Sequence, residues 1–582
     1  MQLTGIDWTI IAAFFIVSLL IGLFVSRKAG KSSSEFFLSG RNMPWWLLGV
    51  SMVATTFSAD TPNLVTDIVR KNGVAGNWVW WAFLLTGMLT VFVYAKLWRR
   101  SGVLTDLEFY EIRYGGAGAA FLRGFRAIYL GVFFNIMIMA TVCLAAIKIG
   151  GVLLGLNPVQ SVVIAGSITV VYSMLGGLRG VLITDFFQFI LAMIGTVWAA
   201  NVVLDLPQIG GLDSLLANDR VEGLTSFIPD LSDTEHLIPI LLIPLAVQWW
   251  SVWYPGAEPG GGGYIAQRML AAKNEQHAMG ATLFFNVAHY ALRPWPWIII
   301  ALASVIIYPD LQSIGEAFPE IDPSIINDDL AYPAMLTFLP TGLLGLVIAS
   351  LVAAFMSTIS THLNWGSSYV VNDFYKRFLK PEASEKELVA VGRLSTLLLM
   401  VFAALFARVR SNALQAFNIL LQIGAGTGLI FILRWFWWRI NAWTEISGMI
   451  ISFLVAVFLE VINPKIGLFT VAGHWNLVIG VLVTTAGWLT VTFLTPPEPE
   501  AVLKDFTRRI NPTIGWKKFG RSDSEGSKLP IQIVGMFFGC MAVYTALFGT
   551  GYLIYGNQIM GYGLLIASGV SIALILKNWR NF

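Results

Sequence analysis

Four hydroxyl side chains are grouped in one apolar segment, residues 335–371. They are Ser357, Thr358, Ser360 and Thr361, in the stretch LVAAFMSTISTHLNWGSS. On a helix, residues three and four apart share a face, so Ser357, Ser360 and Thr361 lie together. Hydroxyl oxygens and freed backbone carbonyls are the ligands that suit Na⁺ inside a membrane. Such hydroxyls also bond back to the preceding turn or join helices, so spacing alone leaves both interpretations open.

Three carboxylates lie inside otherwise apolar segments: Asp60, Asp185 and Glu258. A charged side chain at the bilayer centre costs roughly 2.5–3.5 kcal/mol on insertion scales, which makes Asp60 and Asp185 candidates for ion or proton binding. Each has a structural alternative. Asp60 can cap a half-helix that begins there, and Asp185, after the GGLRG turn, can act as an N-cap. Glu258 is a candidate contact for substrate or cation, or a group that satisfies backbone donors.

An aromatic cluster, Trp249, Trp250, Trp253 and Tyr254, lies just before Glu258. Aromatic faces can stack on a sugar ring, and they hold quaternary ammonium groups by cation–π attraction. Helix packing and anchoring at the membrane interface are the alternative uses of the same side chains. The cluster therefore predicts one wall of a solute pocket without naming the solute.

The elements that must position these residues are membrane-spanning helices. The chain has 582 residues, of which 56% are hydrophobic and 12% charged, whereas a soluble domain carries about 25% charged residues. Apolar runs of about 20 residues recur, each long enough to span a bilayer as a helix, and they lack the period-2 pattern of a barrel strand. We predict an all-α polytopic membrane protein with about fifteen spans.

Two of the spans are interrupted. Residues 55–62 (TTFSADTP) interrupt the span 45–70, and WYPGAEPGGGG interrupts the span 238–266. Proline and glycine on this scale break helices, and broken spans at corresponding places in two halves indicate a transporter binding site. Their separation predicts two five-helix inverted repeats, at 45–204 and 238–436. The remaining segments are then an N-terminal helix and loop (1–44), an extracellular loop (205–237), and about four C-terminal helices (437–582) with a cytoplasmic loop at 496–529.

Loop charges predict the orientation. Basic clusters follow the first, third, seventh, ninth and thirteenth spans, the seventh with Arg268 and Lys273, whereas the loops 205–237 and 308–334 are acid-rich. By the positive-inside rule the N-terminus is outside and the C-terminus is cytoplasmic. The predicted location is the plasma membrane, specifically a bacterial inner membrane.

Other classes of protein lack support in the sequence. The Gly260–Gly263 run has no following Lys-Ser/Thr, so it is not a nucleotide-binding loop. The spans show no nucleophile–base pair, and the five histidines show no metal-ligand spacing, so we predict no enzyme activity. Cys143 and Cys540 are expected to be inert core residues. We expect no nucleic acid and no obligate protein partner, only the bilayer and a small-molecule solute.

Several stretches, in this order and spacing, resemble the sodium:solute symporter family, which has the LeuT-type inverted-repeat fold. They are SGVLTDLEFYEIRYG (101–115), YSMLGGLRGVLITDFFQF (172–189), YIAQRMLAAKNEQHA (264–278), ASLVAAFMSTISTHLNWGSSYVVNDFYKR (349–377) and WFWWRINAWTEISGM (435–449). The resemblance implies a Na⁺-coupled carrier. Its first Na⁺ site would use the carbonyls of Ala54, Phe57 and Ala354 and the hydroxyls of Ser357 and Thr358. A second Na⁺ site, present in some members, would use Asp185, Ser360 and Thr361.

The sequence departs from the family at the solute site. The second broken helix does not align with the glucose or proline branches, and Thr56 stands where other branches carry a substrate-linked Asn or Asp. By position, Thr56, Ser58 and Asp60 are still expected to face the solute, as is Glu258. The aromatic residues favour a sugar or sugar derivative, with an amino acid or a quaternary amine as the alternative.

The expected mechanism is alternating access, in which Na⁺ orders the first broken helix and so creates the solute site. The rival is a proton-coupled or facilitative carrier of the same fold, in which Asp60, Asp185 or Glu258 would carry the proton.

Overall fold

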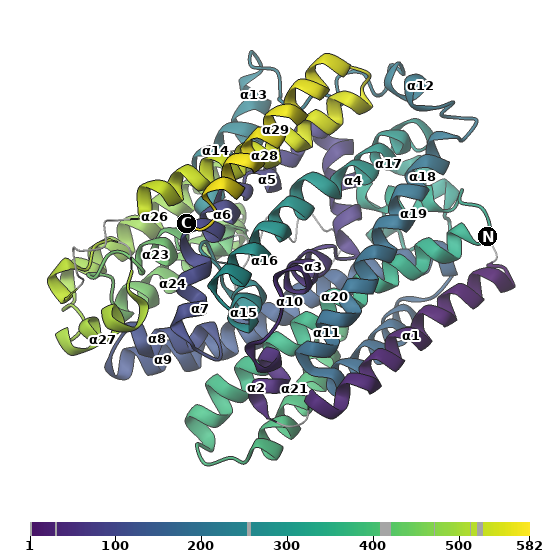
Figure 1. Cartoon of the computed structure of the whole chain (residues 1–582). Helices are drawn as coiled ribbons and strands as arrows, with labels where there is room; N and C mark the ends of the chain where they lie inside the picture. Colours follow the sequence, from purple (N-terminus) through teal and green to yellow (C-terminus); the bar gives the residue numbers. More distant parts are fainter. Residues whose placement is uncertain are drawn as a thin grey trace.

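The computed structural model describes residues 3–29, 32–252, 258–407, 421–470, 472–512, 514–520 and 528–582. Within these ranges the chain forms helices and no strand, apart from one isolated bridge between Met43 and Ala272. The prediction of an all-α fold is confirmed. Figure 1 shows the helices running side by side through the molecule, as a membrane protein requires.

Eleven helical segments of the described chain are long and apolar enough to cross a bilayer. They are Gly5–Phe24, Val74–Ser101, Gly116–Leu154, Gly176–Leu204, Glu275–Ile307, Leu343–Leu379, Glu385–Phe406, Ala442–Ile466, Gly473–Leu494, Leu529–Ile554 and Gln558–Asn578. The described chain also contains the two broken spans and the shorter apolar helix Pro158–Met174. The predicted span 413–436 begins outside the described residues. The last two predicted spans are the helices α28 (Leu529–Ile554) and α29 (Gln558–Asn578).

The first predicted break is present. Helix α3 (Trp45–Thr56) ends where Phe57 leaves helical geometry (φ −84°, ψ 55°), and α4 (Asp60–Asn72) starts three residues later. Ending a helix frees its last carbonyls, because no later N–H group reaches them. At this interruption the Thr55 and Thr56 carbonyls accept hydrogen bonds from the hydroxyls of Thr358 and Thr61 instead.

The second break is longer. Helix α14 (Ile243–Ala246) passes into a short turn at Gln248–Trp250, and a helix resumes only with α15 (Gly263–Ala271). Gly260 and Gly261 have φ of +84° and +95°, a region that other residues rarely adopt. The Gly260 carbonyl accepts a hydrogen bond from the indole of Trp98 at 2.8 Å, which fixes the returning chain against the span Val74–Ser101.

A kink separates the fifth and sixth predicted spans. The helical run α11 (Pro158–Leu204) contains Gly177 in a non-helical conformation (φ 54°, ψ −162°). The GGLRG turn thus divides two helices, as its sequence predicts. Asp185 lies two turns beyond the kink, too far along the second helix to cap it.

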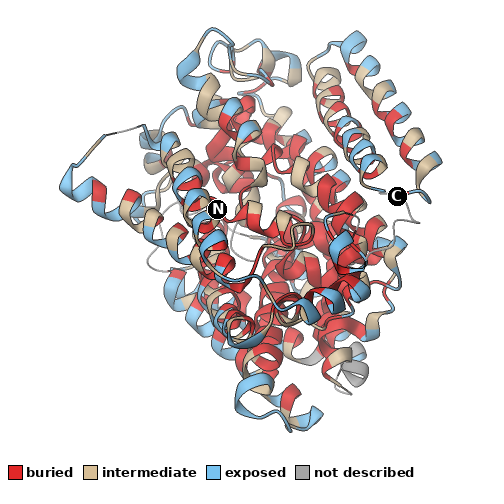
Figure 2. Ribbon diagram, turned by 90° about the vertical axis from the view of Figure 1, so that its left-hand side faces the viewer, coloured by how far each residue is buried: buried red, intermediate tan, exposed pale blue. Residues whose placement is uncertain are grey.

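Helix α20 (Leu343–Ser368) is the central element, and nearly all of its residues are buried. It packs on α11, α3, α10 (Asn135–Leu154) and the first helix, α1 (Gly5–Ala29). Figure 2 shows buried residues concentrated in the interior and exposed ones on the outer helices. The exposed apolar side chains of the outer helices, such as Phe24, Leu494 and Ile559, form a surface suited to lipid.

Candidate functional site

The first predicted Na⁺ ligands lie where the end of α3 meets α20. The Thr358 hydroxyl donates to the Thr55 carbonyl at 2.7 Å and contacts the Ala354 carbonyl at 3.1 Å. Ala54 and Phe57 lie in the same terminal turn, where the Phe57 N–H reaches the Ala54 carbonyl at 3.1 Å. One hydroxyl therefore bridges the central helix and the broken helix.

This donor set fits Na⁺. The groups around Thr358 are uncharged oxygens, carbonyl and hydroxyl, of the hard type that Na⁺ accepts. The residues are at most 3% exposed, so bulk water does not compete for the ion. The Ser357 hydroxyl instead donates to Asp185 at 2.7 Å. Its oxygen lone pairs stay available, so Ser357 joins the predicted first set to a carboxylate.

The second predicted set is linked through an arginine that sequence reasoning missed. Arg268, on α15, donates to Thr361 at 2.7 Å and to Ser51 at 3.1 Å, and Ser51 in turn donates to Asp185. Ser360 bonds back to the Ser357 carbonyl at 3.1 Å. The positive charge that this carboxylate requires is thus supplied by the protein itself.

Charge counting placed Arg268 in a basic segment that follows the seventh span. The structure corrects this, because Arg268 is fully buried between α3, α11 and α20. It is also within cation–π range of Tyr264, 5.8 Å from the ring centroid. An intramembrane arginine is as strong a functional signal as an intramembrane carboxylate, and applying that rule to Arg as well as Asp would have found it.

A polar cavity lies beside the second break. It is bounded by α6 (Leu84–Leu89), by the chain on either side of 253–257, and by α16 (Glu275–Val287). Its polar lining consists of Thr86, Thr90, Ser251, Glu258, Thr282 and Asn286. The Thr86 hydroxyl, the Glu258 Oε2 and the Asn286 Oδ1 are buried and have no hydrogen-bond partner. Buried polar atoms are normally paired, so these three atoms are suited to a polar ligand.

Among the predicted solute contacts, only Glu258 lines this cavity. Its Oε1 is ion-paired with Arg126 of α9 (Gly116–Ile128), which leaves Oε2 facing the cavity. Trp249 packs against the hydrophobic core, and the Trp250 indole donates to the Ala246 carbonyl at 2.9 Å. Trp253 and Tyr254 lie outside the described residues.

The other predicted contacts lie at the first break, beside two residues that the sequence analysis did not select. The Thr56 hydroxyl is 3.0 Å from His289 Nδ1 and 3.3 Å from the Arg293 guanidinium. Ser58 is buried in the break, and Asp60 begins α4 with its Oδ1 lacking a hydrogen-bond partner. The break thus combines hydroxyls, a carboxylate, an imidazole and a guanidinium.

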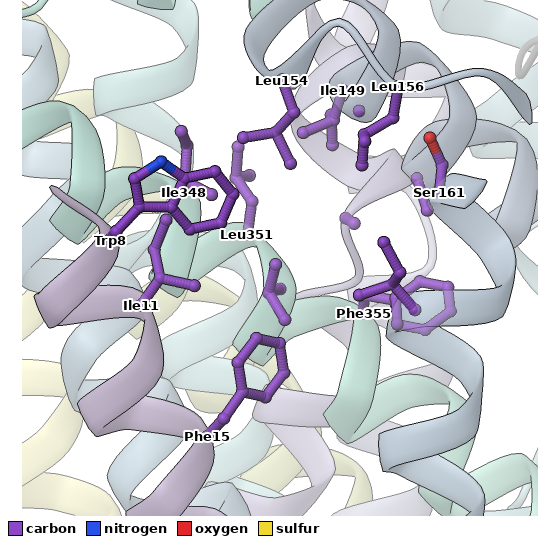
Figure 3. Close-up of a pocket in the computed structure, with 16 residues that line it drawn as sticks. Trp8, Ile11, Phe15, Ile149, Leu154, Leu156, Ser161, Ile348, Leu351 and Phe355 are labelled. Carbon is purple, nitrogen blue, oxygen red and sulfur yellow. The ribbon is translucent and has the colours of Figure 1, made fainter. Parts of the chain in front are cut away.

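A second cavity near the first break is apolar (Figure 3). It lies between α1, α10, α11 and α20 and reaches Ala59. Among the described residues that line it, Ser161 supplies the only side-chain oxygen, and that hydroxyl already donates to the Asn157 carbonyl at 3.2 Å. Besides it, the lining offers a polar solute only the indole N–H of Trp8, so the polar cavity at the second break is the better solute site.

Comparison with known proteins agrees with this architecture. A statistical model of the sodium:solute symporter family matches residues 36–452. The sodium/glucose cotransporter of Vibrio parahaemolyticus is 28% identical over 479 residues, covering 79% of this chain and 86% of that protein. The human sodium/myo-inositol cotransporter 2 is 29% identical over 556 residues, covering 86% of this chain and 79% of that protein.

A solved structure shares the fold. It is a Na⁺-coupled sialic acid symporter in a substrate-bound, outward-open state, with a TM-score of 0.67 and 22% identity over 86% of this chain and 99% of that chain. Likeness at this identity concerns the fold alone, which is of the LeuT type. The family match extends over the greater part of the chain, from before the first break to beyond the central helix α20. The chain therefore belongs to the sodium:solute symporter family and is a membrane transporter that couples Na⁺ to the symport of a small organic solute.

Proposed function

We propose that each transport cycle carries one Na⁺ with a sugar or sugar derivative, by alternating access. The observation that carries the proposal is the Thr358 hydroxyl placed 2.7 Å from the Thr55 carbonyl, at the break of α3. A Na⁺ ion bound there takes oxygens from two elements that move relative to each other in this fold. Its ligands are Ala54, Phe57, Ala354, Ser357 and Thr358.

Coupling follows from the shared break. Na⁺ ordering the end of α3 also fixes Thr56 and Ser58, which lie on the same turn and in the break itself. The solute then binds to a preformed surface, so each ligand increases the affinity for the other, typically by 1–3 kcal/mol. Loss of Na⁺ to a cytoplasm poor in Na⁺ releases this order and with it the solute.

A stoichiometry of one fits the second set of residues. Arg268 donates to Thr361, and Ser51 links it to Asp185, so a positive charge already neutralises this carboxylate. A further cation at Asp185, Ser360 and Thr361 would be close to that guanidinium and repelled by it. We propose that Asp185 and Arg268 instead orient the hydroxyls of α20.

A polyhydroxylated solute suits the polar cavity. Thr86, Glu258 and Asn286 present acceptors and a hydroxyl that have no partner in the protein. A sugar carries several hydroxyl groups that can both donate and accept hydrogen bonds, and the relatives named above are cotransporters of glucose and myo-inositol. Thr56, Ser58 and Asp60 would meet the solute from the first break.

We also propose the orientation that the loop charges predict, in a bacterial inner membrane. Helices α12 (Leu212–Leu216) and α18 (Leu311–Ala317), which belong to the acid-rich loops, lie towards one end of the molecule. Helices α2 (Ser33–Leu38), α9 and α27 (Glu500–Ile510) lie towards the other (Figure 1). The first end would then be outside and the second cytoplasmic. We propose that this chain needs no other protein to transport and has no enzymatic activity.

A titration tests the Na⁺ site without knowledge of the solute. Thermal stability of the detergent-purified protein is followed while NaCl is increased against KCl at constant ionic strength. A saturable, Na⁺-specific stabilisation is expected because Na⁺ binds only the folded state. It should disappear in Thr358→Ala combined with Ser357→Ala, and persist in Thr490→Ala, a hydroxyl that bonds only within its own exposed helix.

Proton coupling is the second candidate, and Asp60 is the observation that favours it. Its Oδ1 has no hydrogen-bond partner beside the first break. If NaCl and KCl had the same effect on the protein, uptake driven by a pH gradient in vesicles would be the next measurement. Uptake that is abolished by Asp60→Asn and indifferent to Na⁺ would replace the Na⁺ mechanism.

A further inference from the structure

Arg293 is a buried charge that no carboxylate contacts directly among the described residues. It follows the π-helical turn Ala288–Leu292, precedes α17 (Pro294–Ile307), and is 1% exposed. Its Nε donates to the His289 carbonyl at 3.2 Å, and its Nη1 approaches the Val53 carbonyl and the Thr56 hydroxyl at 3.4 and 3.3 Å. The other terminal nitrogen, Nη2, donates a hydrogen bond to Nδ1 of the His289 imidazole. All of these acceptors are neutral, and among the described residues no carboxylate oxygen lies within 4.0 Å of its guanidinium.

Several other buried cations of this protein pair directly with a carboxylate. Lys148 is paired with Asp329 at 2.7 Å, Arg434 with Glu445 at 3.3 Å, and Arg126 with Glu258. Arg113 also lacks a carboxylate, but it donates to three main-chain carbonyls at distances of 2.7–3.1 Å. Arg293 has only two long contacts to oxygen on Nη1, where 2.7–3.2 Å is normal for an N–H···O bond.

The aromatic surroundings do not replace a countercharge. The guanidinium carbon of Arg293 lies 5.4 Å from the centre of the Trp297 ring and 6.0 Å from that of Phe57. Such cation–π contacts contribute far less than the cost of burying a charge. An ionised side chain kept in an apolar interior without a partner is expensive, so its presence indicates that an anion joins it in some step of the cycle.

Arg293 lies between the first break and residues that line the polar cavity. The Thr56 hydroxyl that it approaches belongs to the last residue of α3, at the first break. On its other side, the His289 ring is 4.4 Å from Tyr290 and 5.3 Å from Phe285, between ring centres. Tyr290 and Phe285 line the polar cavity. The guanidinium is therefore positioned between the broken helix and the wall of the solute site.

We propose that the transported solute carries a carboxylate and that Arg293, supported by His289, binds it. The inference rests on the proposed function and narrows its substrate class to an acidic sugar or a similar hydroxylated organic acid. A guanidinium can donate two parallel hydrogen bonds to a carboxylate, which gives orientation as well as affinity. The hydroxyl groups of the same solute would then meet Thr86 and Asn286 across the cavity.

Asp60 is a carboxylate of the protein that could pair with Arg293 in place of a solute. It begins α4, on the far side of the same break, and pairing with Arg293 during closure would neutralise both groups. In that case the solute would be neutral and Arg293 would be part of a gate. The two ideas make opposite predictions for carboxylate binding and for the Asp60→Asn variant.

The experiment uses the full chain in detergent, with saturating NaCl and with ionic strength held constant by KCl. Matched pairs serve as probes: D-glucuronate against D-glucose, D-galacturonate against D-galactose, and acetate against acetamide. We expect saturable stabilisation by the acids and little by their neutral partners. Arg293→Gln should weaken acid binding by about tenfold or more, the effect of losing a charge-assisted hydrogen bond. Arg377→Gln, a half-exposed arginine paired with Glu111, should leave it unchanged.

Two further variants keep the proposal testable if Arg293→Gln does not fold. Arg293→Lys keeps the charge but loses the planar fork, so it should fold and bind the acids more weakly. Asp60→Asn removes the competing carboxylate together with one proposed solute contact, so it should keep the preference for the acids over their neutral partners. Equal responses to acids and neutral partners, or acid binding that survives Arg293→Gln, would overturn the proposal. If the same preparations were still stabilised by Na⁺ and not by K⁺ in the absence of any solute, the Na⁺ site would be supported even though the carboxylate proposal had failed.

Discussion

Single residues at the two breaks carry the chemistry proposed for this transporter. The Thr358 hydroxyl of α20 contacts the Thr55 carbonyl of the first break, and the Glu258 carboxylate is shared between an ion pair and a cavity. In the proposal, each residue has one contact that supports the fold and one that binds a ligand. Changes at these positions should therefore separate stability from transport.

Glu258→Gln should destabilise the protein strongly. The substitution leaves the Arg126 guanidinium buried with its closest partner gone, and breaking one side of a buried pair costs about 3–5 kcal/mol. Thermal unfolding in detergent measures the effect. Glu500→Gln, which breaks the exposed pair with Lys504, is the control and should have no measurable effect. Equal melting temperatures for the two variants would contradict the structural role given to Glu258.

Gly87→Ala should impair solute binding while sparing Na⁺ binding. A Cβ at Gly87 would lie 1.9 Å from the Asn286 Oδ1, so the amide would have to leave the cavity. We expect a higher KM for the solute and an unchanged NaCl-dependent stabilisation. Gly563→Ala, on α29 with no atom within 4 Å of the new Cβ, is the matched control. If both variants transport normally, Asn286 is not part of the solute site.

At the scale of elements, a side chain of the peripheral helix α1 bonds to the start of α20, the helix proposed to bind Na⁺. The Asp7 carboxylate accepts hydrogen bonds from the Gly342 and Gly345 N–H groups at 2.8 and 2.9 Å, at the start of α20. These are N–H groups that a helix cannot satisfy internally. Gly345 makes room for this contact, because a Cβ there would lie 2.5 Å from the Asp7 Cα. An element outside the predicted inverted repeats thus caps the start of the helix that carries Ser357 and Thr358.

Asp7→Ala should therefore weaken Na⁺ binding at a distance. Losing the capping carboxylate should cost about 1–2 kcal/mol of stability. Because the first turn of α20 then lacks its hydrogen-bond acceptor, a higher Na⁺ concentration should be needed for half-maximal stabilisation. Thr9→Ala, which removes a hydroxyl that bonds only within the exposed face of α1, is the comparison. A normal Na⁺ titration in Asp7→Ala would show that α1 supports the fold and not the ion site.

The whole molecule has two chemically different ends. One carries the acid-rich loops, and the other carries α27, whose Leu503, Phe506 and Ile510 are buried while its charged face is exposed. Arg100 donates to the Ile510 carbonyl at 2.9 Å, which fastens the 496–529 loop to the span Val74–Ser101. The basic end is thus an ordered surface in its described part, and its charge is the basis of the orientation proposed above.

Labelling in cells tests that orientation. The native cysteines Cys143 and Cys540 are buried, so single cysteines can be introduced at exposed positions, Asp219→Cys on the acidic end and Lys504→Cys on α27. A membrane-impermeant maleimide should label the first in intact cells. The second should react only after the membrane is permeabilised. The reverse pattern would invert the proposed topology, and with it the direction of Na⁺-driven transport.

The sequence by itself determined the class of fold, the two breaks and the hydroxyl-rich helix. Runs of apolar residues admit only helices in lipid, and these runs are interrupted by the polar segment 55–62, which ends in Pro62, and by the proline- and glycine-rich segment 253–263. Local composition suffices for these features because each depends on the residue's own backbone and on the surrounding lipid.

Only the tertiary structure decided which polar groups meet. The family resemblance grouped Asp185, Ser360 and Thr361 as a second ion site, whereas packing places Arg268 from a helix more than 80 residues away beside Thr361. Likewise, the aromatic cluster predicted the solute wall, but Trp249 packs on the core, Trp250 bonds to the Ala246 carbonyl, and the described cavity lining includes Thr86, Thr282 and Asn286 instead. The pairing of buried charges depends on contacts between distant segments, and the free energy of those contacts is not encoded in the local spacing of either segment.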